Sequence, residues 1–288
     1  SSTRPRTSSM EAAPRMALSA LRGYGAFCLS GIAYLVLCEQ KDLSSRTVLR
    51  VVALRSIPGW SEFLITFALF GLVALALIKP LMKLVQRDLA FWLVCAACLA
   101  GVCVPYGAVR DPRWGLLVGT TEFACFPVLQ YMPFFLIGLY VQRRGMARRG
   151  AWLAGSALLT GAAVISFVRA GEPVRFPPSL MWLLLPCLPI VLLTLGCGAL
   201  ERHAGGRRGL EGLLAPVGFM GMNSLFYLLA SNFVIFAVSR MGTLPVMRRS
   251  ERFPFCLETG STPWALVWTL VLLLGIGFMI GLARKPRK

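Results

Sequence analysis

Long runs of apolar residues, separated by short polar and basic segments, set the pattern of this chain. Because about 20 apolar residues in a helix can cross the hydrocarbon core of a bilayer, the pattern predicts about eight membrane-spanning helices. The predicted spans are residues 16–38, 62–85, 89–109, 123–141, 151–168, 179–200, 214–240 and 264–283. Pro80 is expected to kink or end the second span, and Pro186 and Pro189 interrupt the sixth.

The run at residues 214–240 differs from the others because it carries a polar stripe. Asn223, Tyr227 and Ser231 recur every four residues and therefore share one face of a continuous helix, with Asn232 beside it. Polar side chains are costly in hydrocarbon unless they find partners, so this face is expected to point at neighbouring helices or at a hydrated cavity. Two interpretations stay open: the stripe joins helices together, or it lines a substrate site.

Two segments outside the spans have a different character. Residues 1–15 are basic, rich in serine and without periodicity, and we expect a disordered tail there. Residues 43–60 place apolar side chains and arginines at helical spacing, which predicts an amphipathic helix at the membrane surface; an ordinary loop whose arginines bind phosphates is the alternative. The remaining chain, 16–288, is expected to form a single all-α transmembrane domain.

In the last span, Gly277 and Gly281 form a GxxxG pattern that permits close approach of another helix.

The composition agrees with an integral membrane protein. The 288 residues are 57% hydrophobic and 15% charged, with a mean hydropathy of +0.70. Basic loops held in the cytoplasm and contacts with anionic lipids explain the net charge of +18 better than nucleic acid does, because no nucleic-acid-binding motif is present. The lipid bilayer is therefore the expected partner, and other membrane subunits or further copies of the chain are possible ones.

The distribution of Lys and Arg orients the predicted spans. The loops on one side, together with both termini, hold more Lys and Arg than the loops on the other side. The densest clusters, at residues 143–149 and 283–288, both lie on the richer side. By the positive-inside rule we expect a multi-pass protein with both termini in the cytoplasm.

The nine cysteines and the single histidine restrict the chemistry. Most cysteines lie inside apolar runs, where cysteine behaves as a small buried hydrophobe. Only Cys38 and Cys256 lie near loops, where a bridge between them is one interpretation. Cys95 and Cys98 form a CxxC without a second pair or a histidine partner, so no metal site is expected. His203 lies among charged residues of a predicted loop, which excludes a histidine base within the membrane.

Three passages of the chain, and two fainter ones, are similar to successive motifs of one known family. They are FPVLQYMPFFLIGLYVQRRG at 126–145, RFPPSLMWLLL at 175–185 and VGFMGMNSLFYLLASNFVIF at 217–236, with GAFCLSGIAYLV at 25–36 and LRSIPGW at 54–60. The first contains a Pro-Phe-Phe-Leu-x-Gly run before a basic turn, and the third contains Gly-x-Asn-Ser-Leu. The passages resemble, in this order, helices and loops of the type-3 membrane acyltransferases and their heparan-glucosaminide acetyltransferase relatives.

The resemblance implies a helix bundle that takes an acyl group from cytoplasmic acyl-CoA and passes it to a hydroxyl or amine of a sugar-type acceptor. Acyl-CoA would be a co-substrate, and no tightly bound cofactor is expected. The chain departs from the family because no N-terminal helix ending in His is found, and Ala230 and Ser231 occupy positions where a second His is common. Because His is the residue best suited to accept a hydroxyl proton near neutral pH, two alternatives to an enzyme stay open. They are a catalytically silent accessory subunit of a membrane complex and a small transporter.

The candidate binding residues are mainly arginines. Arg143, Arg144, Arg148 and Arg149 follow the fourth span and are expected either to receive the phosphates of CoA or to contact lipid head groups. Arg175, in the sequence RFPP, is the better candidate for an anionic ligand, and snorkelling to the membrane surface is its alternative. The candidate substrate- or cofactor-binding residues are Arg143, Arg144, Arg175 and Asn232.

One carboxylate is placed to accept a proton. Glu122 stands at the expected head of the fourth span, although a helix N-terminus favours a carboxylate without any function. We take Glu122 together with the polar stripe of residues 214–240 as the candidate catalytic residues. The candidate catalytic residues are Glu122, Asn223, Tyr227 and Ser231.

Overall fold

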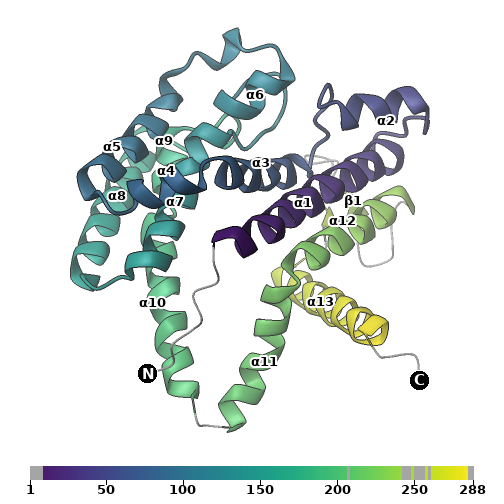
Figure 1. Ribbon diagram of the computed structural model, residues 1–288. Helices are drawn as coiled ribbons and strands as arrows, with labels where there is room; N and C mark the ends of the chain where they lie inside the picture. Colours follow the sequence, from purple (N-terminus) through teal and green to yellow (C-terminus); the bar gives the residue numbers. More distant parts are fainter. Residues whose placement is uncertain (1–8, 206–207, 242–247, 250–256, 259–260, 285–288) are drawn as a thin grey trace. The chain divides into compact units, whose positions relative to one another are not determined.

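The computed structural model describes residues 9–205, 208–241, 248–249, 257–258 and 261–284 and is built almost entirely of helices (Figure 1). The helices are α1 (Ser9–Leu37), α2 (Ser45–Val52), α3 (Glu62–Ala76), α4 (Ile78–Leu84), α5 (Asp88–Leu99), the 3₁₀ turns η1 (Ala100–Cys103) and η2 (Tyr106–Ala108), α6 (Pro112–Val118), α7 (Val128–Arg144), α8 (Arg149–Ala170), α9 (Leu180–Leu184), α10 (Cys187–Ala204), α11 (Arg208–Met222), α12 (Ser224–Met241) and α13 (Thr262–Arg284). Two short strands, β1 (Arg248–Arg249) and β2 (Leu257–Glu258), pair in the antiparallel sense. The predicted all-α class is confirmed.

The chain divides into two compact units. The first contains the described residues up to Gly25, together with Leu54–Ile57 and Glu62–His203. The second contains Ala26–Ala53, Pro58–Ser61 and the described residues from Ala204 onward. Helix α1 therefore contributes its first part to one unit and its second part to the other.

Fewer helices are long and apolar enough to cross a membrane than the sequence predicted. In the described part of the chain four helical segments qualify: Met16–Leu37, Arg149–Ala170, Leu180–Ala204 and Thr262–Gly281. They correspond to the first, fifth, sixth and eighth predicted spans. Two bent helix pairs, α3 with α4 and the part of α11 from Leu214 with α12, raise the number to six if each pair is one span. These pairs correspond to the second and seventh predicted spans.

The third and fourth predicted spans are shorter than expected, because the chain between them is not helical throughout. Helix α5 and the turn η1 together cover only Asp88–Cys103. Helix α7 is 17 residues long and begins at Val128. Between them lies α6, whose start is fixed by Asp111: its carboxylate accepts a hydrogen bond from the Arg113 N–H at 2.8 Å, with Pro112 at the first helical position.

Three of the candidate spans are little covered by the rest of the protein. In α8, in Leu180–Ala204 and in α13, only 11% of the residues in the most apolar 18-residue stretch are buried. Large apolar side chains on these helices, such as Leu158, Leu193 and Leu274, are therefore exposed. Such helices are unfavourable in water and favourable in lipid. They indicate an integral membrane protein, as the composition predicted.

Both bent pairs break at identifiable residues. Helices α3 and α4 meet at an angle of 85° around Leu77. In a continuous helix the ring of Pro80 would clash with the carbonyl four residues earlier, that of Ala76, and the bend avoids this clash; the predicted kink is confirmed. Helices α11 and α12 meet at 82° around Asn223. Residues 214–240 are therefore not the continuous helix that the sequence predicted.

The predicted amphipathic segment, residues 43–60, is helical only in α2. Ser44 caps this helix, because its hydroxyl accepts a hydrogen bond from the Thr47 N–H at 3.2 Å. After α2 the chain cannot continue as a helix, since Leu54 and Trp60 both adopt a positive φ. The position of α2 at a membrane surface stays a prediction. Of the predicted disordered tail, residues 1–8 lie outside the described residues, and α1 begins at Ser9.

Each unit has its own apolar core. In the first unit, Phe91 and Cys95 of α5 pack against Leu136 of α7, together with two side chains from the α4 region. In the second unit, Tyr227 of α12 packs against Ile276 of α13, with Phe219 of α11 against the same cluster.

The connection between α5 and α7 is held by one fully buried side chain, Gln130 of α7. Its Nε2 donates to the carbonyl oxygen of Gly101 at 3.0 Å and to that of Val118 at 2.7 Å. It also lies 3.5 Å from the Tyr106 hydroxyl. A buried carbonyl without a partner is costly, so Gln130 stabilises a non-helical stretch that the apolar surroundings would otherwise disfavour.

We predict that the substitution Gln130→Leu destabilises the protein. The Val118 carbonyl would lose its donor, at a cost of about 1–3 kcal/mol, whereas the Gly101 carbonyl would keep its hydrogen bond from the Val104 N–H. Gln142→Leu is the matched control, because Gln142 is exposed in the last turn of the same helix. Thermal unfolding in detergent micelles should show a lower Tm for Gln130→Leu and little change for the control. Equal Tm values for Gln130→Leu and the wild type would contradict the role given to this side chain.

Candidate functional site

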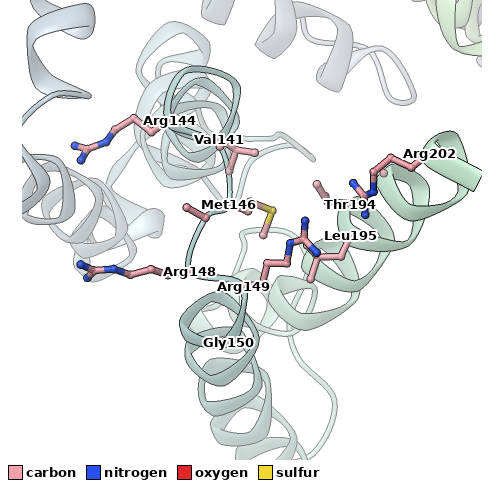
Figure 2. A pocket seen from close by; sticks show the side chains of 12 residues that line it. Val141, Arg144, Met146, Arg148, Arg149, Gly150, Thr194, Leu195 and Arg202 are labelled. Carbon is pink, nitrogen blue, oxygen red and sulfur yellow. The ribbon is translucent and has the colours of Figure 1, made fainter. Parts of the chain in front are cut away.

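A pocket of about 910 Å³ lies between the α7–α8 turn and one face of α10 (Figure 2). The turn begins at Gly145, whose φ of 70° lies in the left-handed region that glycine adopts without strain. From α10, the residues that line the pocket recur at the spacing of one helical face. They are Thr194, Leu195, Gly198 and Arg202. We call this cavity the arginine pocket.

The arginine pocket takes its name from Arg144, Arg148, Arg149 and Arg202, and the described residues that line it include no acidic side chain. Figure 2 shows that these four side chains do not all point into it. Arg149 of α8 and Arg202 of α10 point toward one another across the cavity, whereas Arg144 and Arg148 point away. Two guanidinium groups that face one another repel, and an anion placed between them removes the repulsion.

Arg144 contacts another part of the protein. Its Nη1 lies 2.6 Å from Oδ1 of Asp88, and its guanidinium lies over the Tyr140 ring, 5.4 Å from the ring centroid. The Tyr140 hydroxyl donates to the same Asp88 oxygen at 3.0 Å. Arg144 therefore joins the end of α7 to the start of α5. Arg143 is exposed and does not line the arginine pocket.

Of the two arginines that point into the cavity, the sequence analysis grouped Arg149 with its neighbours as a possible phosphate contact but left it out of the candidate binding residues, and it missed Arg202. Arg202 lies between Glu201 and His203, and nothing in the local sequence marks it as a binding residue. One signal was present, because the positive-inside rule assigned the segments that hold Arg149 and Arg202 to the same side of the membrane. That both line one cavity follows from the packing of α10 near the α7–α8 turn.

Arg175 lies in a second cluster, beside three aromatic rings. Its Cζ is 4.7 Å from the ring centroid of Phe176 and 5.8 Å from those of Phe126 and Trp182. In the described part of the chain no carboxylate forms an ion pair with it. Phe126 precedes the first residue of α7, whereas the arginine pocket lies at the last. At 1.5 Å per residue, about 25 Å of helix separates the two ends.

Glu122 is not at the head of a helix as predicted. It is exposed in the segment before α7, where its N–H donates to the Thr120 hydroxyl at 3.2 Å. The sequence placed the helix start too early because residues 123–127 are mostly apolar. Pro127 disfavours a helical conformation at the residue before it, so α7 begins only at Val128.

The predicted polar stripe does not follow one helix face, because the chain breaks at Asn223. The Asn223 amide donates to the carbonyl oxygen of Phe219 at 2.7 Å and so covers the end of α11. The Ser231 hydroxyl donates to the carbonyl oxygen of Leu228 at 2.9 Å, within α12. Both side chains satisfy the backbone of their own helices.

Asn232 and Tyr227 face different neighbours. Asn232 is buried, and its Nδ2 donates to the Ser30 hydroxyl at 3.1 Å and to the carbonyl oxygen of Trp60 at 3.3 Å. Tyr227 is buried against α13, where a Cβ added to Gly277 would lie 2.6 Å from the tyrosine oxygen. These contacts favour the interpretation in which the polar residues of α12 join helices together.

The histidine and the loop cysteines complete the candidate residues. His203 lies in the last turn of α10 and not in a loop as predicted; it is exposed, with Nδ1 3.2 Å from the carbonyl oxygen of Ala199. Burial raises the pKa of the Cys125 thiol to about 11, while a hydrogen bond to the Thr120 backbone opposes this shift. The structure does not test a bridge between Cys38 and Cys256, because Cys256 lies outside the described residues.

Comparisons with known proteins assign no family. No protein-family model, no curated protein and no solved structure matches the chain. The resemblance to the type-3 membrane acyltransferases therefore stays a prediction from the passages quoted above.

We predict that Gly277→Ala destabilises the second unit, because the added methyl group would displace the buried Tyr227. Overpacking of this kind costs about 1–3 kcal/mol. Gly281→Ala is the matched control: it lies one turn later in α13, gains the same helix propensity and meets no atom within 4 Å. Thermal unfolding should show a lower Tm for Gly277→Ala alone. A Tm for Gly277→Ala as high as that of the control would rule out close packing of Tyr227 at this glycine.

Proposed function

We propose that this protein is an acyltransferase-like integral membrane protein that binds the phosphates of acyl-CoA in the arginine pocket. The observation that carries the proposal is the pair Arg149 and Arg202, which point toward one another in a cavity whose described lining has no acidic side chain. A guanidinium binds phosphate through two parallel hydrogen bonds. Two guanidinium groups on separate helices therefore suit a ligand with more than one negative charge.

The rest of the pocket lining suits a ligand that is only partly charged. Val141, Met146 and Leu195 contribute apolar surface beside the arginines. The volume of about 910 Å³ is in the range of small-molecule sites and exceeds what a single phosphate fills. Acyl-CoA has both the phosphates and the less polar portion that such a lining favours.

The proposal places the arginine pocket on the cytoplasmic side of the membrane. The segments that hold Arg149 and Arg202 are those that the positive-inside rule assigns to the cytoplasm, where acyl-CoA is the available donor. In this orientation the protein crosses the membrane several times, and both termini are cytoplasmic.

Acyl transfer also needs a base on the acceptor side. The acceptor hydroxyl or amine attacks the thioester carbonyl, the CoA thiolate leaves, and a base takes the acceptor proton. Glu122 is the predicted base, yet about 25 Å of helix separates its end of α7 from the arginine pocket. This separation favours the second candidate function, a catalytically silent subunit that binds the same ligand without turning it over.

The break at Asn223 favours a third candidate, a small transporter. Transporters often use discontinuous helices to form sites near the middle of the membrane, and α11 and α12 meet at 82°. Against this candidate, the Asn223 side chain already bonds to the carbonyl of Phe219. Uptake of a ligand into proteoliposomes would identify a transporter, whereas release of CoA thiol would identify an acyltransferase.

We predict that CoA binds the purified protein in phosphatidylcholine nanodiscs and that Arg149 and Arg202 are required. Loss of a hydrogen bond to a charged group costs about 1.5–3 kcal/mol, so Arg149→Gln or Arg202→Gln should each weaken binding by about tenfold or more. Arg143→Gln is the matched control, because Arg143 precedes the same turn but does not line the pocket. Isothermal titration with CoA measures the affinity.

Two results would contradict the proposed donor site. One is unchanged CoA affinity in the folded double variant Arg149→Gln/Arg202→Gln. The other is an equal loss in Arg143→Gln, which would assign binding to general surface charge. The same preparations, given acetyl-CoA and sugar acceptors, separate the two leading functions: release of free CoA thiol indicates an enzyme, and binding without release indicates an accessory subunit.

A further inference from the structure

Arg175 lies in a set of aromatic contacts at the end of α7 opposite the arginine pocket, within the same unit. We call Phe126, Phe176 and Trp182 the aromatic frame of Arg175. The Cζ atom of Arg175 lies within 5.8 Å of all three ring centroids. Phe126 and Phe176 also pack edge to face, with centroids 5.5 Å apart. A cation over aromatic rings is attracted by their negative faces, so these contacts hold the guanidinium in one place.

Two residues of the aromatic frame are hydrogen-bonded to other elements, Phe126 through its backbone and Trp182 through its ring. The carbonyl oxygen of Phe126 accepts a hydrogen bond from the Thr66 hydroxyl of α3 at 2.6 Å. The indole Nε1 of Trp182 donates to the Tyr131 hydroxyl of α7 at 3.2 Å. The frame therefore joins two separate stretches of the chain, with hydrogen bonds to α3 and α7.

The loop that carries Arg175 is fixed as well. The Ser179 N–H donates to the carbonyl oxygen of Val174 at 3.0 Å, which closes the loop around Arg175. The Tyr106 hydroxyl, from η2, donates to the carbonyl oxygen of Pro178 at 3.1 Å. An arginine that only snorkels to the membrane surface needs none of these contacts, because its flexible stem finds water without help.

The guanidinium of Arg175 keeps the capacity to donate hydrogen bonds. Aromatic rings contact the faces of a guanidinium, whereas its N–H groups lie in its plane and receive an oxyanion there. Arg175 is exposed, and no described carboxylate pairs with it. Tyr131 lies near enough to Arg175 for an electrostatic interaction. Because its hydroxyl accepts the Trp182 hydrogen bond, its own proton is free to be donated.

We propose that Arg175, held by its aromatic frame, binds an oxyanion at the end of α7 opposite the arginine pocket. The group is a phosphate or a carboxylate, and an anionic lipid head group or a soluble molecule can supply it. This site does not depend on the proposed acyl-CoA site, since the two share no residue.

The test has two arms, both with the full chain. In the lipid arm, native mass spectrometry compares retention of phosphatidylglycerol and phosphatidylcholine by protein taken from mixed vesicles. In the soluble arm, inorganic phosphate or acetate is added in phosphatidylcholine nanodiscs while tryptophan fluorescence is followed, because Trp182 belongs to the frame. Arg175→Gln is expected to lower the affinity by about tenfold or more in the arm that holds the natural ligand type.

Three further variants test whether binding needs the guanidinium and its aromatic frame or only a positive charge. Arg175→Lys keeps the charge but loses the planar fork and should bind with intermediate affinity. Phe176→Leu keeps Arg175 but removes the nearest ring of the frame, and it should weaken binding several-fold. Arg169→Gln is the matched control, because Arg169 is exposed in the last turn of α8, shortly before the same loop. It should bind as the wild type does.

If Arg175→Gln loses affinity in the lipid arm, the ligand is a lipid head group. If it loses affinity in the soluble arm, the ligand is a soluble oxyanion. Unchanged binding by folded Arg175→Gln in both arms overturns the proposal, as does an equal loss in Arg169→Gln. If Arg175→Gln does not fold, Arg175→Lys and Phe176→Leu decide by the same criteria. CoA titration depends on Arg149 and Arg202, so failure of either proposal is seen separately.

Discussion

Backbone groups that leave a helix in apolar surroundings must find other partners, and the first unit depends on how they do so. Between α5 and α7 the chain forms short turns, and the carbonyls of Gly101 and Val118 both accept hydrogen bonds from Gln130. Just before α7, the carbonyl of Phe126 accepts one from Thr66. Side chains of neighbouring helices thus take the place of helical hydrogen bonds. The contact from Thr66 also fixes the backbone of Phe126, a residue of the aromatic frame.

Features that depend on local composition could be predicted from the sequence. The apolar runs of α8 and α13 and the kink caused by Pro80 needed no knowledge of the rest of the fold. The break at Asn223 and the late start of α7 at Val128 were missed for a common reason. An i, i+4 polar pattern is the same in a continuous and in a broken helix, and apolar residues before a helix look like its first turn. At Asn223 the side chain bonds to the carbonyl oxygen of Phe219 and covers the end of α11, and at Val128 the preceding Pro127 sets the start of α7.

The candidate sites show the same division. The sequence has 30 basic and 12 acidic residues, so most cations cannot have a carboxylate partner, and charge alone cannot select those that bind a ligand. Arg144 looked as suitable as Arg149, but Asp88, distant in sequence, pairs with it. Arg202 looked unremarkable until α10 placed it across a cavity from Arg149. Which arginine stays available is a property of the packing.

Helix α7 sets the relation between the two basic sites. Its last turn leads into the α7–α8 turn of the arginine pocket, and its first turn carries Tyr131 of the Arg175 site. A helix of 17 residues holds these ends about 25 Å apart, close to the thickness of the apolar layer of a bilayer. A single ligand anion cannot bridge that distance, so the two sites must serve separate anionic groups. Glu122 shares the Arg175 end of the helix. In the proposed acyltransferase, a donor bound at one end and an acceptor bound at the other would therefore meet only if the acyl-bearing arm of the donor extends along α7.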